Sequence, residues 1–90
     1  MPDTFETFRE QALAGGFTEV LERRWAPLQL VPRHSHPFAA SALVVQGEMW
    51  LTVDGRTQHL RAGDRFALDA DAPHDERYGA DGATYWVARR

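Results

Sequence analysis

Two histidines separated by one residue, His34 and His36, are the side chains best suited to chemistry in this sequence. Because side chains alternate along an extended segment, both imidazoles are expected to point to the same face, where together they can grip a metal ion. His74 lies much further along the chain. A fold that brings it opposite the pair would complete a three-nitrogen site with positions left open for water or a substrate. The sequence therefore predicts a metal site at His34, His36 and His74.

The composition restricts the ion that such a site can hold. The chain has no cysteine, which excludes disulfides, thiolate metal sites and thiol nucleophiles. Three imidazoles favour one divalent transition metal, namely zinc, nickel, iron, copper or cobalt, over magnesium and calcium, which prefer oxygen ligands. Lysine is also absent, so a Schiff base on a lysine side chain is excluded. The fourth histidine, His59, is predicted to be exposed.

Three further polar residues are candidates for a catalytic role. On an extended segment Glu76 and Tyr78 share the face of His74. Glu76 could add a carboxylate to the site, or it could face solvent near a strand end. Tyr78 could donate a hydrogen bond to a bound group, or it could simply pack in the core. Gln46 is a candidate for the polar lining of the site, provided that no bulge shifts the strand register before it. No catalytic residue is assigned among the three.

Length and charge favour some kinds of partner over others. Ninety residues make one small domain, whose core is marginal by itself, so a homodimer interface or a bound metal is expected to add stability. The net charge of −3 and the scattered arginines argue against nucleic acid as a partner. No apolar run is long enough to cross a membrane, and the N-terminus resembles no signal peptide. We expect a cytoplasmic protein that binds a small molecule.

The N-terminal residues carry the signals of a helix. Residues 3–14 are predicted to be helical, with Asp3 or Thr4 as the cap and Gly15-Gly16 as the end. We expect residues 1–16 to form a helix packed on the outside of the domain and residues 17–90 to form a barrel. The alternative is that the helix is exchanged with a partner subunit.

From residue 17 onward the pattern changes to short extended segments separated by turn signals, which is typical of an all-β sandwich or barrel. Asp54-Gly55 is the strongest hairpin signal, because a type I′ turn needs positive φ at both central residues. Gly47, Gly63-Asp64 and residues 79–82 are interpreted as further turns. The fold class is therefore all-β, either a closed barrel or a two-sheet jelly roll. About eight strands are predicted, at 17–25, 28–36, 39–46, 48–53, 57–60, 65–68, 74–78 and 84–88.

The order of these residues resembles the two motifs of the cupin superfamily, in particular its small single-domain members of the cupin_2 type. His34 and His36 match the histidine pair of the first motif, and Gly47 matches its closing glycine. Gly63 and His74 match the opening glycine and the histidine of the second motif. The resemblance implies a small β-barrel with a divalent metal inside it and, in many members, a homodimer.

Several positions depart from the family pattern. The position of the metal-binding glutamate is occupied by Ala40, which cannot coordinate an ion. Two glycines of the pattern are replaced by Leu28 and Asp71, a proline by Asp69, and the last asparagine by Tyr78. The resemblance therefore implies a ligand set reduced to three histidines, as in the thiol dioxygenases of the superfamily.

Three functions remain open, the third being a metal-free structural barrel, which the loss of the glutamate permits. The chain is expected to be a small metal-binding cupin with a three-histidine site, acting as an oxygenase, isomerase or lyase on a small polar substrate. The alternative is a cupin without catalytic activity that binds or senses a small molecule, with or without a metal. The discriminating feature is an acid or base beside the metal.

Overall fold

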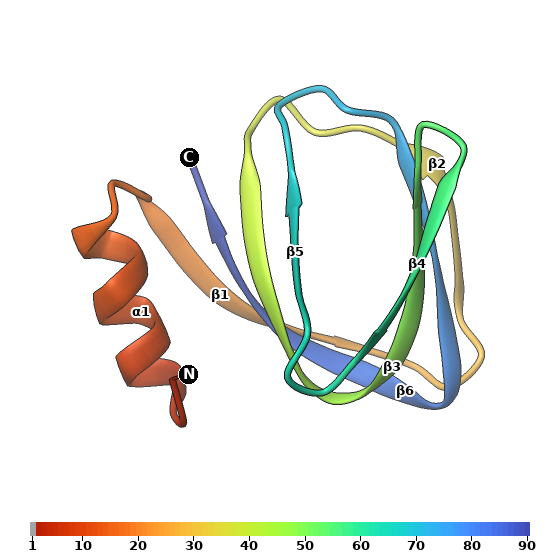
Figure 1. Ribbon diagram of the computed structural model, residues 1–90, viewed down its shortest axis with the longest axis horizontal. Helices are drawn as coiled ribbons and strands as arrows, with labels where there is room; N and C mark the ends of the chain where they lie inside the picture. The colour runs from red at the N-terminus through yellow and green to blue at the C-terminus, as the bar shows by residue number, and fades with distance from the viewer. Residues whose placement is uncertain (1) are drawn as a thin grey trace.

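The computed structural model describes residues 2–90 and consists of one helix followed by antiparallel strands (Figure 1). The elements are α1 (Phe5–Ala14), β1 (Glu19–Trp25), β2 (Leu30–His34), β3 (Ala40–Val53), β4 (Arg56–Arg61), β5 (Arg65–Leu68) and β6 (His74–Arg89). The prediction of an all-β jelly roll with one N-terminal helix is confirmed. None of the helices in the described part of the chain is long and apolar enough to span a membrane.

Two long strands, β3 and β6, pair with each other along most of their length and contribute to both sheets of the jelly roll. Residues 74–78 of β6 pair with β2 and with the second half of β3, whose other edge pairs with β4. Residues 83–89 of β6 pair with β1 and with the first half of β3, whose other edge pairs with β5. The inward faces of the two four-stranded sheets enclose the core.

The prediction of eight separate strands is corrected in one respect. All eight segments contain extended residues, but the third and fourth are joined in β3 and the last two are joined in β6. Gly47 and residues 79–82 are not turns: they lie inside these strands, where the pairing register shifts between Gly47 and Met49. A strand can bend from one sheet into the other at such a shift.

Positive φ angles mark the tight turns. Asp54 and Gly55 have φ of 52° and 76°, and Val53 pairs with Arg56 across them, which confirms the predicted type I′ hairpin. Leu28 and Asp71 also lie in the left-handed region, with φ of 59° and 64°. At both positions a glycine of the family pattern is replaced, and positive φ is the conformation for which glycine is usually needed.

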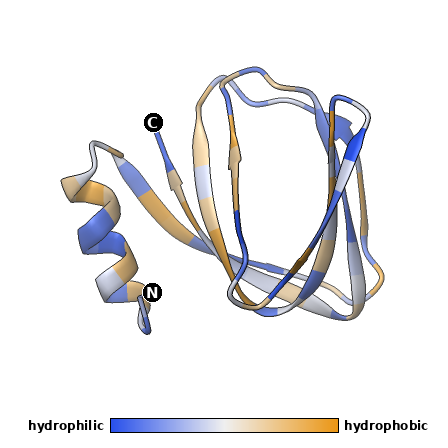
Figure 2. Cartoon of the chain, in the orientation of Figure 1, coloured by the Kyte–Doolittle hydropathy of each residue, from blue (hydrophilic) through white to orange (hydrophobic). Residues whose placement is uncertain are grey.

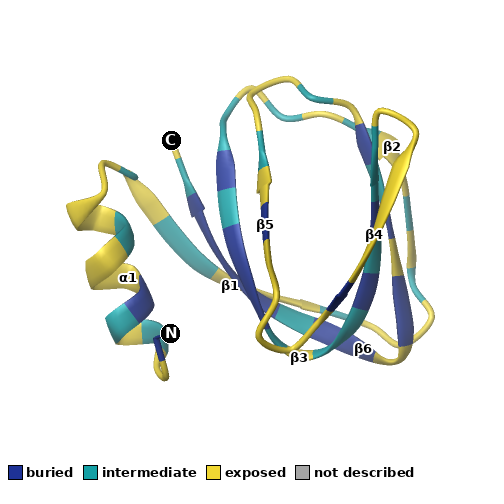
Figure 3. Cartoon of the chain, viewed as in Figure 1, coloured by how far each residue is buried: buried dark blue, intermediate teal, exposed yellow. Residues whose placement is uncertain are grey.

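Alternation along the strands divides the apolar residues into an inner and an outer cluster, and burial follows β3 and β6 in Figure 3. The inner core lies between the sheets and includes Val44, Met49, Leu51, Tyr78 and Val87. The outer cluster lies where α1 covers the sheet and consists of Phe8, Leu43, Trp86 and Ala88.

Helix α1 carries both hydrophobic and hydrophilic segments (Figure 2) and buries Phe8 against the outer face of the sheet. The helix begins after Thr4, whose side chain accepts a hydrogen bond from the backbone N–H of Thr7. Of the two predicted caps it is Thr4 that caps the helix, and this bond satisfies one of the free N–H groups of the first turn.

Candidate metal centre

His34 is the last residue of β2, and His36 lies in the loop that follows it. Their ring centroids are 4.8 Å apart. The ring of His36 also stacks on Phe38, with centroids 4.9 Å apart and planes 10° apart. The predicted pair of imidazoles therefore exists, although strand pairing ends between its two members.

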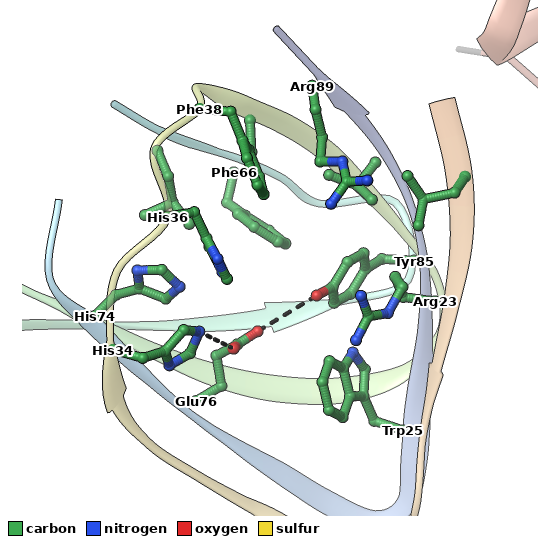
Figure 4. Close-up of a pocket in the computed structure, with 14 residues that line it drawn as sticks. Arg23, Trp25, His34, His36, Phe38, Phe66, His74, Glu76, Tyr85 and Arg89 are labelled. Carbon is green, nitrogen blue, oxygen red and sulfur yellow. Dashed lines mark hydrogen bonds and ion pairs between the residues drawn. The ribbon is translucent and has the colours of Figure 1, made fainter. Parts of the chain in front are cut away.

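His74 begins β6 and is brought beside the pair by antiparallel pairing with β2, in which His34 and His74 are direct partners. Its ring centroid lies 4.3 Å from that of His34 and 5.3 Å from that of His36. The side chain of His74 is buried, whereas His34 and His36 are half-buried. The three histidines thus form a cluster with one buried and two half-buried members (Figure 4).

Backbone carbonyl groups set the tautomers of two of these rings. His34 Nδ1 lies 2.8 Å from the carbonyl oxygen of Pro32, and His74 Nδ1 lies 2.9 Å from that of Ala72. Because a carbonyl oxygen only accepts, each Nδ1 must carry a proton, and in the neutral ring each Nε2 then keeps a free lone pair. A metal-binding histidine is usually oriented in this way by its second nitrogen.

The geometry of the cluster suits an ion after a small contraction. The candidate ligand atoms of the three histidines lie within 4.8 Å of one another. Nitrogen ligands about 2.1 Å from a tetrahedral ion are about 3.4 Å apart, so the rings must draw together by roughly 1 to 1.5 Å. Partial burial, and next the proximity of His34 and His74, lower the pKa of His36 and favour its neutral, coordinating form.

Glu76 is the carboxylate nearest to the histidines. It is 6% exposed, which overturns the alternative that it faces solvent. Its Oε1 accepts a hydrogen bond of 2.7 Å from the Tyr78 hydroxyl, and the Tyr85 hydroxyl lies 3.5 Å from the same atom. Its Oε2 lies 3.8 Å from His34 Nε2 (Figure 4). One carboxylate oxygen is thus tied to tyrosine, and the other faces the cluster.

The hydroxyl groups of Tyr78 and Tyr85 both lie at Oε1 of Glu76, the oxygen that faces away from the histidines. Tyr78 is 1% exposed and stacks on Trp25, with ring centroids 5.2 Å apart. Burial, and next the proximity of Tyr85 and Glu76, raise the pKa of Tyr78 well above its usual value. Burial, and next the charge of Glu76, raise the pKa of Tyr85 to about 12. Both phenols therefore stay protonated and remain able to donate to Glu76.

We expect the tyrosines to show no ionisation step at the ordinary phenol pKa of about 10. The unfolded chain releases these protons near pH 10 while the folded chain keeps them, so stability is lost as pH rises from about 10 towards 12. For Tyr85 the free energy of unfolding falls by about 2 to 3 kcal/mol over this pH range. Phenolate absorbance and circular dichroism, followed together during an alkaline titration, should change together. A phenolate step near pH 10 in a chain that is still folded would contradict this burial.

Gln46 lies away from the cluster. It is exposed, and its side-chain oxygen accepts a hydrogen bond of 3.2 Å from the Thr84 hydroxyl. The β3–β6 register shifts between Val44 and Gln46, so the alternation that points Ala40 inward does not continue to Gln46. The prediction that Gln46 contributes to the polar lining of the site is therefore wrong. His59 is exposed as predicted and bonds to Glu48 on the outer surface.

The cluster opens into a pocket of about 80 Å³ between the sheets. Ala40 lies in its wall, at the position where the family pattern has its glutamate. Sequence reasoning missed the residues across the pocket, Arg23, Trp25, Tyr85 and Arg89. The signal that could have found them is strand alternation, because Arg23 and Trp25 share one face of β1, and Tyr85 and Arg89 share one face of β6.

Solved structures share this fold. A protein of unknown function from Rhizobium leguminosarum superposes with a TM-score of 0.75 at 20% identity, over 83% of this chain and 70% of that one. An RmlC-like cupin from Shewanella frigidimarina gives 0.69 at 23% identity, over 78% and 63%. A chain from the structures of the DMSP lyases RdDddP and RnDddQII gives 0.74 at 24% identity, over 79% and 37%.

Sequence comparison adds a curated relative and a family. Over 39 residues the chain is 44% identical to an uncharacterized HTH-type transcriptional regulator of Haemophilus influenzae, a match that spans 43% of this chain and 13% of the regulator. The family model for the cupin domain (Cupin_2) matches residues 22–88. That match covers the barrel from β1 to β6, including all three clustered histidines, and with the shared fold it shows that this chain belongs to the Cupin_2 family of cupin domains.

Proposed function

We propose that this chain is a small metal-binding cupin whose His34, His36 and His74 hold one divalent transition metal ion. It would act as an oxygenase, isomerase or lyase on a small polar molecule bound in the adjoining pocket. The observation that carries the proposal is the convergence of three imidazoles, two of which have their Nε2 lone pairs freed by Nδ1 bonds to backbone carbonyls. An ion held there would act as a Lewis acid on a bound molecule.

Glu76 is the acid or base that the catalytic hypothesis requires. Its Oε2 is free of the tyrosine bonds and faces His34. As a fourth ligand it would replace the carboxylate that is missing at Ala40. As a free carboxylate it would accept a proton from a molecule bound beside the histidines, since a general base must lie within hydrogen-bonding reach of the proton that it takes.

A cupin that binds or senses a small molecule without converting it is the second candidate. The similarity to part of a transcriptional regulator favours it. Incubating the metal-loaded chain in air with small polar molecules that bind to it, and following them by NMR, separates the two functions. Conversion of a bound molecule supports the enzyme, and recovery of every bound molecule unchanged supports the sensor.

The first test is the metal content of the purified, untagged chain after incubation with zinc, nickel, iron(II), copper or cobalt. We expect about one equivalent by elemental analysis, because the chain has a single cluster of three imidazoles in residues 2–90. A bound ion should also raise the midpoint of thermal unfolding. No retained metal with any of these ions would reject the metal site.

The variant Glu76→Gln tests the carboxylate. The amide that replaces it keeps an oxygen to accept the Tyr78 hydrogen bond but carries no charge towards His34, so we expect metal affinity to fall roughly 10- to 100-fold. Competition with a coloured chelator measures the affinity. Glu48→Gln is the matched control, because Glu48 also pairs with a histidine, His59, but on the outer surface. Equal affinities for Glu76→Gln and wild type would remove Glu76 from the site.

A further inference from the structure

The pocket has two chemically different ends. The histidines and Glu76 form one end, and the guanidinium groups of Arg23 and Arg89 lie across from them (Figure 4). Between the two ends the wall is largely apolar, with Leu21, Phe38, Phe66, Leu68 and Val87. A ligand that fills this pocket must therefore combine a short apolar body with a group that suits two arginines.

Arg23 has no anionic partner in the part of the chain that the structure describes. No carboxylate lies within 4.0 Å of it, and its guanidinium carbon lies 4.8 Å from the centroid of the Trp25 ring. Its neighbour Arg24 points the other way and pairs with Glu22 at 3.1 Å. Strand alternation thus turns one arginine outward to an ion pair and leaves the other, unpaired, at the pocket.

Arg89 is only partly satisfied by the protein. One of its terminal nitrogens bonds to Glu19, and its guanidinium carbon lies 4.6 Å from the centroid of the Phe38 ring. Its Nε is buried and makes no hydrogen bond within residues 2–90. Glu19 balances one of the two guanidinium charges, so this end of the pocket keeps an excess of positive charge.

A second buried donor lies in the same pocket. The indole N–H of Trp25 is buried and has no hydrogen-bond partner within residues 2–90. Among the described residues, Trp25 Nε1 and Arg89 Nε are the two buried side-chain polar atoms that lack a partner. A buried donor without an acceptor is unfavourable. An unpaired donor on Trp25 and a second on Arg89 itself indicate that an acceptor belongs at this end of the pocket.

We propose that this end of the pocket binds the carboxylate of a small aliphatic acid through Arg23 and Arg89, with the acid's carbon chain directed towards the histidines. The inference rests on the proposed function, because it assigns the substrate class of the same site. A planar carboxylate matches the paired donors of guanidinium groups. The pocket is small, about 80 Å³, which favours a short acid. The apolar wall favours such an acid over inorganic phosphate.

The test is calorimetric titration of the chain with acetate, propionate and butyrate, each compared with its neutral amide, and with inorganic phosphate. It is made on the metal-free chain and repeated on the zinc-loaded chain. We expect at least one acid to bind 10-fold or more tightly than its amide and than phosphate. Arg23→Gln and Arg89→Gln should each weaken the binding of that acid 10-fold or more, and Arg24→Gln should leave its binding affinity unchanged.

The outcomes separate this inference from the metal site. The carboxylate site is overturned if the acid binds no more tightly than its amide or than phosphate, or if Arg23→Gln leaves the affinity for the acid unchanged. This holds even when one equivalent of zinc is bound. Acid binding to the metal-free chain that depends on both arginines upholds it, even when no zinc is retained. Arg23 makes no ion pair within residues 2–90, so its replacement tests the site if Arg89→Gln fails to fold.

Discussion

Replacing His36 with alanine is expected to abolish metal binding and leave the barrel folded. Removing one of three ligands should weaken metal affinity by more than about 100-fold, because the loss of an outer-shell partner alone costs about 10- to 100-fold. His36 lies in a loop, is half-buried and makes no side-chain hydrogen bond within residues 2–90, so its loss should change stability little. Elemental analysis and the thermal shift on metal addition measure the effect.

The fourth histidine supplies the matched control for this experiment. His59 is exposed on β4, where it stacks on Trp50 and bonds to Glu48. Strands β3 and β6 lie between β4 and β2, which carries His34. His59→Ala should therefore keep one equivalent of metal and the same thermal shift as wild type. His74→Ala should lose the metal as His36→Ala does, with an added loss of stability because His74 is buried. Retention of a full equivalent in His36→Ala would reject the three-histidine site.

The sequence was sufficient for features that depend on local rules. The separation of His34 and His36 by one residue was enough to predict that their rings lie together, although His36 is in the loop after β2. Asp54-Gly55 forms its hairpin because few residues other than glycine, asparagine and aspartate tolerate positive φ. The placement of His74 beside the pair is not local. It was available only through the resemblance to the cupin motifs, and it arises from the pairing of β2 with β6.

Features that depend on irregular strand pairing could not be predicted from the sequence. A single register shift before Gln46 turns that residue outward, because one residue of slip moves a side chain to the other face. Glu76 is also approached by Tyr85 from the second half of β6, with the Tyr85 hydroxyl 3.5 Å from Oε1. The positive φ of Leu28 illustrates the converse: it follows from the fold and overrides the preference of leucine, whereas the aspartate at position 71 tolerates positive φ.

Gly47→Ala is expected to be the most destabilising small substitution in the barrel. At Gly47 the strands β3 and β6 approach so closely that a Cβ atom would lie 2.0 Å from the carbonyl oxygen of Gly82 and 2.9 Å from Ala83 Cα. These are backbone atoms, so relief requires the two long strands to separate where they pass from one sheet to the other. The φ of +76° adds roughly 1 to 2 kcal/mol. We expect a total loss of about 4 kcal/mol or more, measured by urea unfolding.

Gly55→Ala separates the two causes of that loss. Gly55 has the same φ of +76°, but nothing lies within 4 Å of the Cβ position, so alanine there should cost only the roughly 1 to 2 kcal/mol of the left-handed backbone. The difference between the two variants measures the close approach of β3 and β6. If both variants lost the same stability, the contact between Gly47 and Gly82 would play no part, and the glycine that matches the family motif would be needed for its φ alone. A larger loss for Gly47→Ala would mean that the glycine is needed because it lets the paired strands β3 and β6 approach closely where both pass from one sheet to the other, and hence lets eight strand positions be built from six strands.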